Sequence, residues 1–284
     1  MGVTFHEFKF LEYFSNTYDF GDVLTLGKQE IILDEDDKKK LNLKNYDCAK
    51  DEYIDNLLKE KFSAQSVKSI DNSSFEGADL IHDFNKPIKE SFEKFDTILD
   101  FGTSEHIFNV NQSFNNIYKL CKSGGNILHS LPANNNCGHG FWQFSPELFF
   151  SLYSEENGFS ETEIFIFNTY DKYSWWKVKK QISGDRLEIS SNSPLYILVK
   201  TVKKLEKNEM QVQQSDYIER WNNKIDRQLS KKSKLSIYWK LIKDGLKKSG
   251  YNLLPKKISD KIKGKNIIEK SDFKKNKNLE KIVF

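Results

Sequence analysis

The most constraining stretch of this sequence covers residues 95–139, because it contains one complete strand–helix–strand unit. Its apolar periodicity predicts a strand at 97–101, an amphipathic helix at about 110–121 and a second strand at 126–131. Strands joined in this way run parallel, and the crossover is right-handed in nearly all proteins. The polar, histidine-bearing segments that follow the two strands are therefore expected to meet at the edge of a sheet where ligands bind.

Further apolar segments extend this unit into a larger sheet and predict an α/β fold. The expected sheet is doubly wound, mainly parallel, seven-stranded and Rossmann-like. Its strands are expected at 22–27, 66–70, 78–82, 97–101, 126–131, 161–168 and 194–200. The expected domains are an N-terminal helical cap at 1–20, the sheet domain at 21–204 with a helical insertion at about 28–65, and a basic, largely helical extension at 205–284.

The charges of the chain are strongly divided between its two ends. Residues 1–199 carry a net charge of −11 and residues 200–284 a net charge of +14. The basic end is either a set of solvated Lys-rich helices or a surface for a partner, such as a second copy of the chain or an anionic membrane. Its aromatic residues Tyr238, Trp239 and Tyr251 interleave with lysines as in a nucleic-acid surface, but their helical spacing favours a packed face.

Cysteine usage and the absence of several motifs narrow the class of protein. Three cysteines without C-x-x-C spacing argue against a disulfide framework or a zinc knuckle and favour a reducing cytoplasm. No signal peptide and no run of the roughly 20 apolar residues that span a bilayer is recognised. The sequence has no nucleophile elbow, no H-E-x-x-H and no carboxylate cluster with metal spacing, so neither a hydrolase nor a metal site is expected.

Residues at the ends of the first three strands suggest an adenosine site. Gly27 closes the first strand and lets a ligand approach the backbone, and Asp71 ends the second strand, where an acid can accept from both ribose hydroxyls. Asp83 and Phe84 follow the third strand and are candidates for contact with adenine, although Asp83 equally fits a turn before Pro87. Glycine-rich phosphate motifs are absent, which disfavours NAD and ATP but not a nucleoside without phosphates.

Three motifs together resemble the class I S-adenosylmethionine-dependent methyltransferases. VLTLG at 23–27 looks like their first motif, FDTILDFGTSEHI at 95–107 like their F-D-x-h-x-x-x-x-h-x-E-H motif, and CKSGGNIL at 121–128 like their L-K-P-G-G turn. The similarity covers about residues 21–200. The family's first motif is usually hhDhGxGxG, whereas here Thr25 replaces the acid and Gln29 the second glycine. The resemblance is therefore to a divergent subgroup, like those among bacterial methyltransferases of sugars and other small molecules.

The resemblance implies S-adenosylmethionine as the cofactor and a polar small molecule as the methyl acceptor. O-methylation of a sugar or a phosphorylated surface-glycan precursor is expected, with His139 as the general base and His106 as the second candidate. The candidate cofactor-binding residues are Gly27, Lys28, Gln29, Asp71, Asp83, Phe84, Phe101 and Gly102. The candidate substrate-binding residues are Thr103, Asn134, Asn135 and Trp142.

A second interpretation is a non-catalytic module with a methyltransferase-like sheet. In that case the basic C-terminal region is the working surface, and it binds nucleic acid, a membrane or a protein partner. The replacements at Thr25 and Gln29 favour this alternative, whereas Asp71, the E-H pair and the Gly-Gly turn favour the enzyme.

Overall fold

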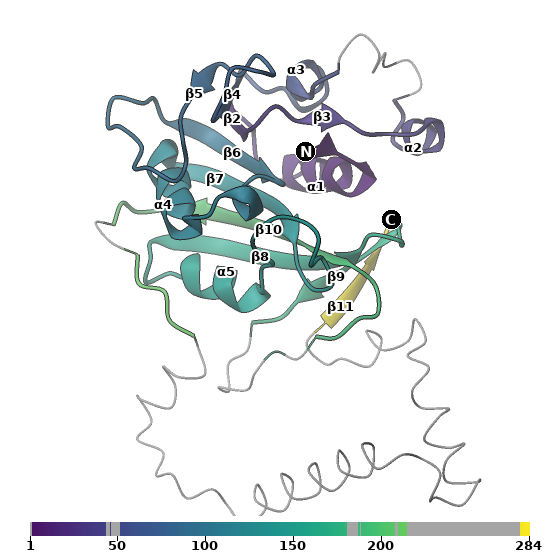
Figure 1. The fold of residues 1–284 in the computed structure, drawn as a ribbon. Coiled ribbons are helices and arrows are strands. Elements are labelled where there is room, and N and C mark those ends of the chain that lie inside the picture. Colours follow the sequence, from purple (N-terminus) through teal and green to yellow (C-terminus); the bar gives the residue numbers. More distant parts are fainter. Residues whose placement is uncertain are drawn as a thin grey trace, which may run out of the picture.

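The computed structural model of this protein describes residues 2–43, 46, 52–180, 187, 189–207, 210–214 and 279–284. Its centre is a sheet of nine strands in the order β11-β9-β8-β10-β7-β6-β2-β4-β5 (Figure 1). The strands are β2 Asp22–Leu26, β4 Ser66–Asp71, β5 Leu80–Ile81, β6 Phe95–Phe101, β7 Cys121–Pro132, β8 Phe159–Asn168, β9 Ser174–Val178, β10 Leu195–Lys203 and β11 Leu279–Val283. A separate small sheet pairs β1 (Gly2–Val3) with β3 (Glu30–Ile31) in parallel.

One half of the large sheet is parallel, as expected. Strands β5, β4, β2, β6 and β7 all pair in parallel, and their spatial order corresponds to 3-2-1-4-5 along this half of the chain. This is the order of a doubly wound sheet, whose topological switch point lies between its first and fourth strands. Here that point lies between β2 and β6. The fold is α/β and Rossmann-like.

The other half is antiparallel, which corrects the expectation of seven mainly parallel strands. β10 runs antiparallel to both β7 and β8, and β9 and β11 continue the alternation beyond β8. The short strand around Trp175 is not among those expected from the sequence, and β8 and β11 supply its hydrogen-bonding partners. β11 lies in the segment expected to be helical. Residues 215–278, which hold most of that expected extension, lie outside the described residues.

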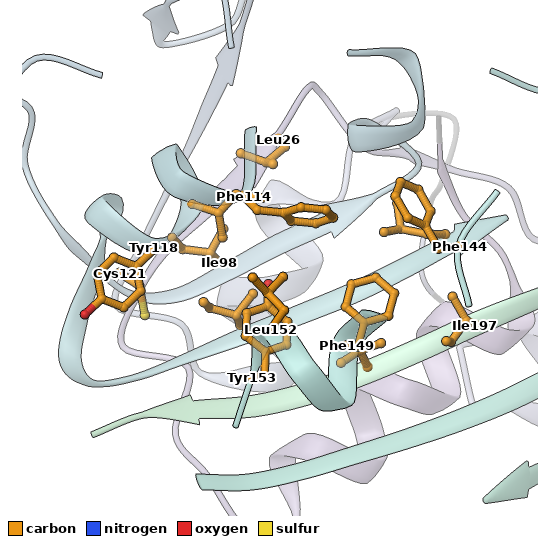
Figure 2. Close-up of a cluster of buried hydrophobic side chains, with 14 of the residues drawn as sticks. Leu26, Ile98, Phe114, Tyr118, Cys121, Phe144, Phe149, Leu152, Tyr153 and Ile197 are labelled. Carbon is orange, nitrogen blue, oxygen red and sulfur yellow. The ribbon is translucent and has the colours of Figure 1, made fainter. Parts of the chain in front are cut away.

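Helices cover both faces of the sheet. They are α1 Phe5–Ser15, α2 Glu35–Lys40, α3 Asp55–Phe62, α4 Val110–Leu120 and α5 Pro146–Leu152. Successive residues of a strand face opposite sides: Ile98 of β6 packs in one core cluster with residues of α4 and α5, whereas Leu99 packs in a second cluster with residues of α1 and α3. Figure 2 shows the first cluster, which contains Ile98 of β6, Phe114 of α4 and Phe149 of α5. The Phe114 and Phe149 ring centroids are 5.9 Å apart.

The first helix is fastened to the carboxyl edge of the sheet. It begins in a capping box, in which Thr4 and Glu7 satisfy each other's backbone groups. The Ser130 hydroxyl near the end of β7 donates to Oε1 of Glu7 at 2.6 Å. The start of α1 therefore lies beside the edge at which a ligand is expected. Among the described helices, none has the length and apolar character needed to cross a membrane.

Candidate active site

A cavity of about 920 Å³ opens at the carboxyl edge of the sheet. Phe101 and Gly102 at the end of β6 line it together with Ser130 of β7 and Tyr196 of β10. The start of α1, β3 and the segment leading into α2 contribute the remaining walls, along with residues 167–172. The volume is in the range of small-molecule sites. The contributions of α1 and of residues 167–172 were not foreseen, because nothing in their own sequence indicates that they fold over this edge.

The two histidines expected at this edge do come together in the wall of the cavity. His106 ends the short 3₁₀ turn η1 (Ser104–His106), and His139 lies in the loop after β7; their ring centroids are 5.2 Å apart. Between them lies Glu105, whose side chain is completely buried. Its Oε1 is 3.3 Å from Nε2 of His139 and 3.9 Å from Nε2 of His106. Glu105 was expected only as part of a motif, and the structure makes it the centre of this cluster.

A buried network holds the η1 turn in place. The Asp100 carboxylate in β6 accepts from the backbone N–H of Ser104 at 3.1 Å and from its hydroxyl at 2.6 Å. Asp100 also lies 2.8 Å from Nδ1 of His129, whose Nε2 contacts the Tyr153 hydroxyl at 2.5 Å. Both ring nitrogens of His129 are thus in contact with polar groups inside the core. Asp100 is a positioning residue that sequence reasoning missed, and its one signal is an acid inside an apolar strand.

The loop after β7 closes tightly against η1. The backbone N–H of Phe141 donates to the Glu105 carbonyl at 2.7 Å. Gly140 has a φ of +72°, and a Cβ there would lie 2.8 Å from both Cγ and the carbonyl oxygen of Glu105. Only glycine combines this left-handed conformation with so close an approach.

The buried position of Glu105 changes its acidity. Burial, reinforced by the negative charge of Asp100, raises the pKa of Glu105 to about 8. Oε2 of Glu105 makes no hydrogen bond within the described part of the chain. The pKa of His106 is lowered, first by burial and second by repulsion from His139. The raised pKa means that the protonated, uncharged form of the Glu105 carboxyl group is favoured at neutral pH.

The loop after β2 is braced by side chains at the positions where the family motif differs. Gly27 has a φ of +71°. The Thr25 hydroxyl donates to the Gly27 carbonyl at 2.9 Å, and the hydroxyl of Thr103 and Nε2 of Gln29 both donate to the Leu26 carbonyl at 2.7 Å. Gln29 is buried, and its Oε1 has no partner among the described residues. Thr25 and Gln29 thus preserve an ordered turn without the usual acid and second glycine.

Asp71 lies next to this turn. The backbone N–H of Gly27 donates to the carbonyl of Ile70 at 2.8 Å, so the ends of β2 and β4 are adjacent. The half-buried Asp71 carboxylate accepts from the N–H of Ser73 at 3.1 Å. Lys28 pairs with Asp55 of α3 at 2.9 Å.

The candidates after β5 fit a structural turn better than a ligand contact. The Asp83 carboxylate accepts from the backbone and side chain of Asn85 at 3.0 and 2.9 Å, and it lies 3.3 Å from the Lys86 ammonium. Phe84 is only 6% exposed and belongs to the core cluster of Figure 2. Little of its ring is accessible to an adenine.

All four candidate substrate residues, including Thr103, lie outside the lining of the cavity. Asn135 has a φ of +64°, and its side-chain amide donates to the carbonyls of residues 191 and 193. The Asn134 carbonyl accepts from the backbone N–H of Leu195 at 2.9 Å, and the Trp142 indole donates to the Ile107 carbonyl at 2.9 Å. These contacts shape the loop that carries His139. Of the predicted site residues, Phe101, Gly102, His106 and His139 line the cavity.

Comparison with known proteins gives fold-level similarity only. No family model matches the sequence, and no curated protein matches it significantly. Among solved structures, the chain is similar to the N-methyltransferase NodS from Bradyrhizobium japonicum, with 11% identity, a TM-score of 0.37, and coverage of 69% of this chain and 94% of that one.

Two further methyltransferase structures are similar at the same level. Phosphoethanolamine N-methyltransferase 2 from Haemonchus contortus has 13% identity and a TM-score of 0.39, covering 69% of this chain and 51% of that one. A S-adenosylmethionine-dependent methyltransferase from Clostridium acetobutylicum has 12% identity and a TM-score of 0.28, covering 77% and 78%. Similarities this low assign neither an activity nor a substrate to this chain.

Proposed function

We propose that this protein is a S-adenosylmethionine-dependent methyltransferase that methylates a hydroxyl group of a polar small molecule. The observation that carries the proposal is the arrangement around the switch point of the sheet. Gly27 and Asp71 stand at the adjacent ends of β2 and β4, and His106 and His139 line a cavity beside the end of β6. In a doubly wound sheet the ligand crosses this point, so a donor on one side would meet an acceptor on the other.

The residues at the end of β2 fit an adenosyl ligand. The Asp71 carboxylate would accept from the ribose hydroxyls, and Gly27 and Gly102, both with positive φ, would let the ligand approach the backbone closely. When bound, S-adenosylmethionine supplies an electrophilic methyl group on a positively charged sulfur.

On the acceptor side, His139 would act as the general base. If its Nε2–H donates to Oε1 of Glu105, 3.3 Å away, then Nδ1 is the basic nitrogen that takes the proton from the acceptor hydroxyl. A positioned base of this kind contributes roughly 10²–10⁴-fold to the rate. His106 and the cavity walls would orient the acceptor, and orientation contributes up to about 7–11 kcal/mol in favourable cases.

The charges of the cavity favour an uncharged sugar over a phosphorylated acceptor. Among the described residues, its lining includes the carboxylates Glu7, Glu30, Asp34 and Asp37 and one lysine, Lys172. Lys172 is already paired with Asp34 at 2.9 Å and with Asp37 at 3.0 Å. A phosphate group would therefore meet net negative charge, whereas sugar hydroxyls can donate to the carboxylates.

Calorimetric titration of the full chain with S-adenosylhomocysteine tests the proposal. The wild type and Asp83→Ala are expected to bind it, and Asp71→Ala is expected to bind at least about tenfold more weakly, because loss of a hydrogen bond to a charged group costs about 1.5–3 kcal/mol. Release of S-adenosylhomocysteine from S-adenosylmethionine in the presence of sugars, sugar phosphates or amino sugars then identifies the acceptor class. Absence of binding by the wild type would refute the enzyme and leave the non-catalytic binding module.

A further inference from the structure

The side chains of Glu105, His106 and His139 form a group with the geometry of a metal site. Each offers one ligand atom, and the three atoms all lie within 4.8 Å of one another. Ligands bound about 2.0–2.2 Å from one ion at right-angled or tetrahedral positions are about 2.8–3.6 Å apart. The 3.3 Å from Oε1 of Glu105 to Nε2 of His139 matches this separation. The 3.9 Å from Oε1 of Glu105 to Nε2 of His106 is longer, and the three ligand atoms would have to move closer together when an ion binds.

The buried carboxylate is the second observation that indicates a cation. Glu105 is fully buried, and within the described part of the chain the two histidines are the basic side chains within 4.0 Å of its carboxyl group. Its Oε2 has no hydrogen-bond partner among the described residues. Burial disfavours the ionised form of a carboxyl group, and a coordinated cation would stabilise that form.

We propose that Glu105, His106 and His139 bind one divalent transition-metal ion in the wall of the cavity. Two imidazoles and one carboxylate suit first-row ions such as Zn²⁺, Co²⁺ or Mn²⁺ rather than Mg²⁺ or Ca²⁺, which prefer oxygen ligands only. Both histidines line the cavity. The coordination positions left open by three protein ligands therefore face the space in which an acceptor binds.

The protein holds these ligands rigidly enough for a site of this kind. Asp100 anchors the start of η1 through the backbone and hydroxyl of Ser104, at 3.1 and 2.6 Å. From the other side, the N–H of Phe141 holds the Glu105 carbonyl at 2.7 Å. Supporting hydrogen bonds of this type orient metal ligands and tune their affinity.

A bound ion could activate the acceptor hydroxyl in place of a general base. This role of the ion rests on the proposed function. An acceptor hydroxyl that coordinates the ion has a lowered pKa and a fixed orientation, and its proton passes to solvent. The oxygen then forms a bond to the methyl carbon as the carbon–sulfur bond breaks, and the electron pair of that bond stays on sulfur. His139 thus serves as a ligand, and the ion takes over the role otherwise given to its free imidazole.

Metal binding can be measured without any acceptor. The tag-free full chain, treated with a chelator and dialysed, is titrated with Co²⁺ and Zn²⁺ by calorimetry, and Co²⁺ binding is followed by visible absorption. We expect the wild type to bind one ion per chain. The metal affinity is expected to fall by more than about 100-fold in Glu105→Gln, His106→Ala and His139→Ala, because removing a residue that only supports a ligand already lowers metal affinity by about 10–100-fold.

Two control variants test whether side chains outside this site bind the metal ion. His82→Ala changes a histidine that lies elsewhere and contacts the Lys86 carbonyl at 3.0 Å, so binding is expected to be unchanged. Cys137→Ser tests the exposed thiol two residues before His139 and is also expected to leave binding unchanged. Circular dichroism confirms that each variant is folded, and the nearly isosteric Glu105→Gln keeps the test valid if a histidine variant unfolds.

The outcomes distinguish the metal site from the proposed function. The metal site is overturned if the wild type binds no metal ion, or if folded Glu105→Gln binds the ion with the same affinity as the wild type. If the same samples bind S-adenosylhomocysteine, the proposed methyltransferase remains, with His139 as its general base. One-to-one metal binding that depends on the three side chains supports the site, even if S-adenosylhomocysteine fails to bind and the proposed function is lost.

Discussion

Ser130 near the end of β7 donates its hydroxyl to Glu7 in the first turn of α1, at 2.6 Å, and both side chains are buried. This bond joins the centre of the sheet to a helix more than a hundred residues away in the chain. Glu7 also completes the capping box with Thr4. The first turn of α1 lines the cavity. The Glu7 carboxylate thus holds this turn in two ways, by capping the helix and by accepting the hydrogen bond from Ser130.

Ser130→Ala is expected to destabilise the fold, because it leaves a buried oxygen of Glu7 without a donor. The expected loss in free energy of unfolding is about 1–3 kcal/mol, measured by urea denaturation. Ser123→Ala is the control, since the hydroxyl of Ser123 donates to the Lys204 carbonyl in an exposed position and its loss is expected to cost less than about 0.5 kcal/mol. Equal effects of the two substitutions would contradict this role of the Ser130–Glu7 bond.

Asp100→Asn is expected to weaken both the core and the candidate site. The amide cannot accept from Ser104 and His129 together as the carboxylate does, so at least one buried group loses its partner and the expected loss is about 1–3 kcal/mol. Because Asp100 positions η1, turnover should fall more than affinity for S-adenosylhomocysteine. Asp36→Asn removes only a surface pair with Lys40 and should be neutral in both assays.

The parallel half of this fold could be predicted from the sequence because its signals are local. The predicted strands at 66–70 and 97–101 correspond to β4 and β6, and the helix expected at about 110–121 is α4. Each has its own apolar period and turn residues, so no distant partner is needed to recognise it. The switch point and the meeting of the two histidine loops follow from this half alone.

The rest of the fold depends on contacts between distant segments. Trp175 of β9 is completely buried because it packs against Phe10 of α1 and Phe165 of β8, with ring centroids 5.9 and 5.6 Å away. No pattern within either segment specifies that contact. Likewise, the burial of Glu105 results from the loop of Gly140 closing over η1, which the E-H motif by itself does not indicate.

The two described cysteines are expected to differ strongly in reactivity. Burial raises the pKa of Cys121 to about 12, whereas Cys137 is exposed. The thiolate is the reactive form, so at one mildly alkaline pH iodoacetamide should label the exposed Cys137 while Cys121 stays largely unmodified. Peptide mass spectrometry measures both rates, and labelling in urea shows that both thiols are intrinsically reactive. Comparable native rates would show that Cys121 is not enclosed between α4 and the sheet.

Gly140→Ala should disturb the candidate site while Gly138→Ala, in the same loop, should not. The added methyl group at 140 meets Cγ and the carbonyl oxygen of Glu105 at 2.8 Å and also disfavours the required φ of +72°. A non-glycine residue held in such a conformation costs about 1–3 kcal/mol. At Gly138 a Cβ meets nothing within 4 Å, so its substitution tests the effect of simply adding a methyl group to this loop.

The two glycine variants are compared by thermal unfolding and by turnover. Gly140→Ala is expected to lower both the unfolding temperature and the turnover rate, because the loop must move away from η1 and carries His139 away from Glu105. S-adenosylhomocysteine binding should change little, since Gly27 and Asp71 lie at other strand ends. If Gly140→Ala behaves like Gly138→Ala in both measurements, the close packing of this loop on Glu105 is not what holds the two histidines together.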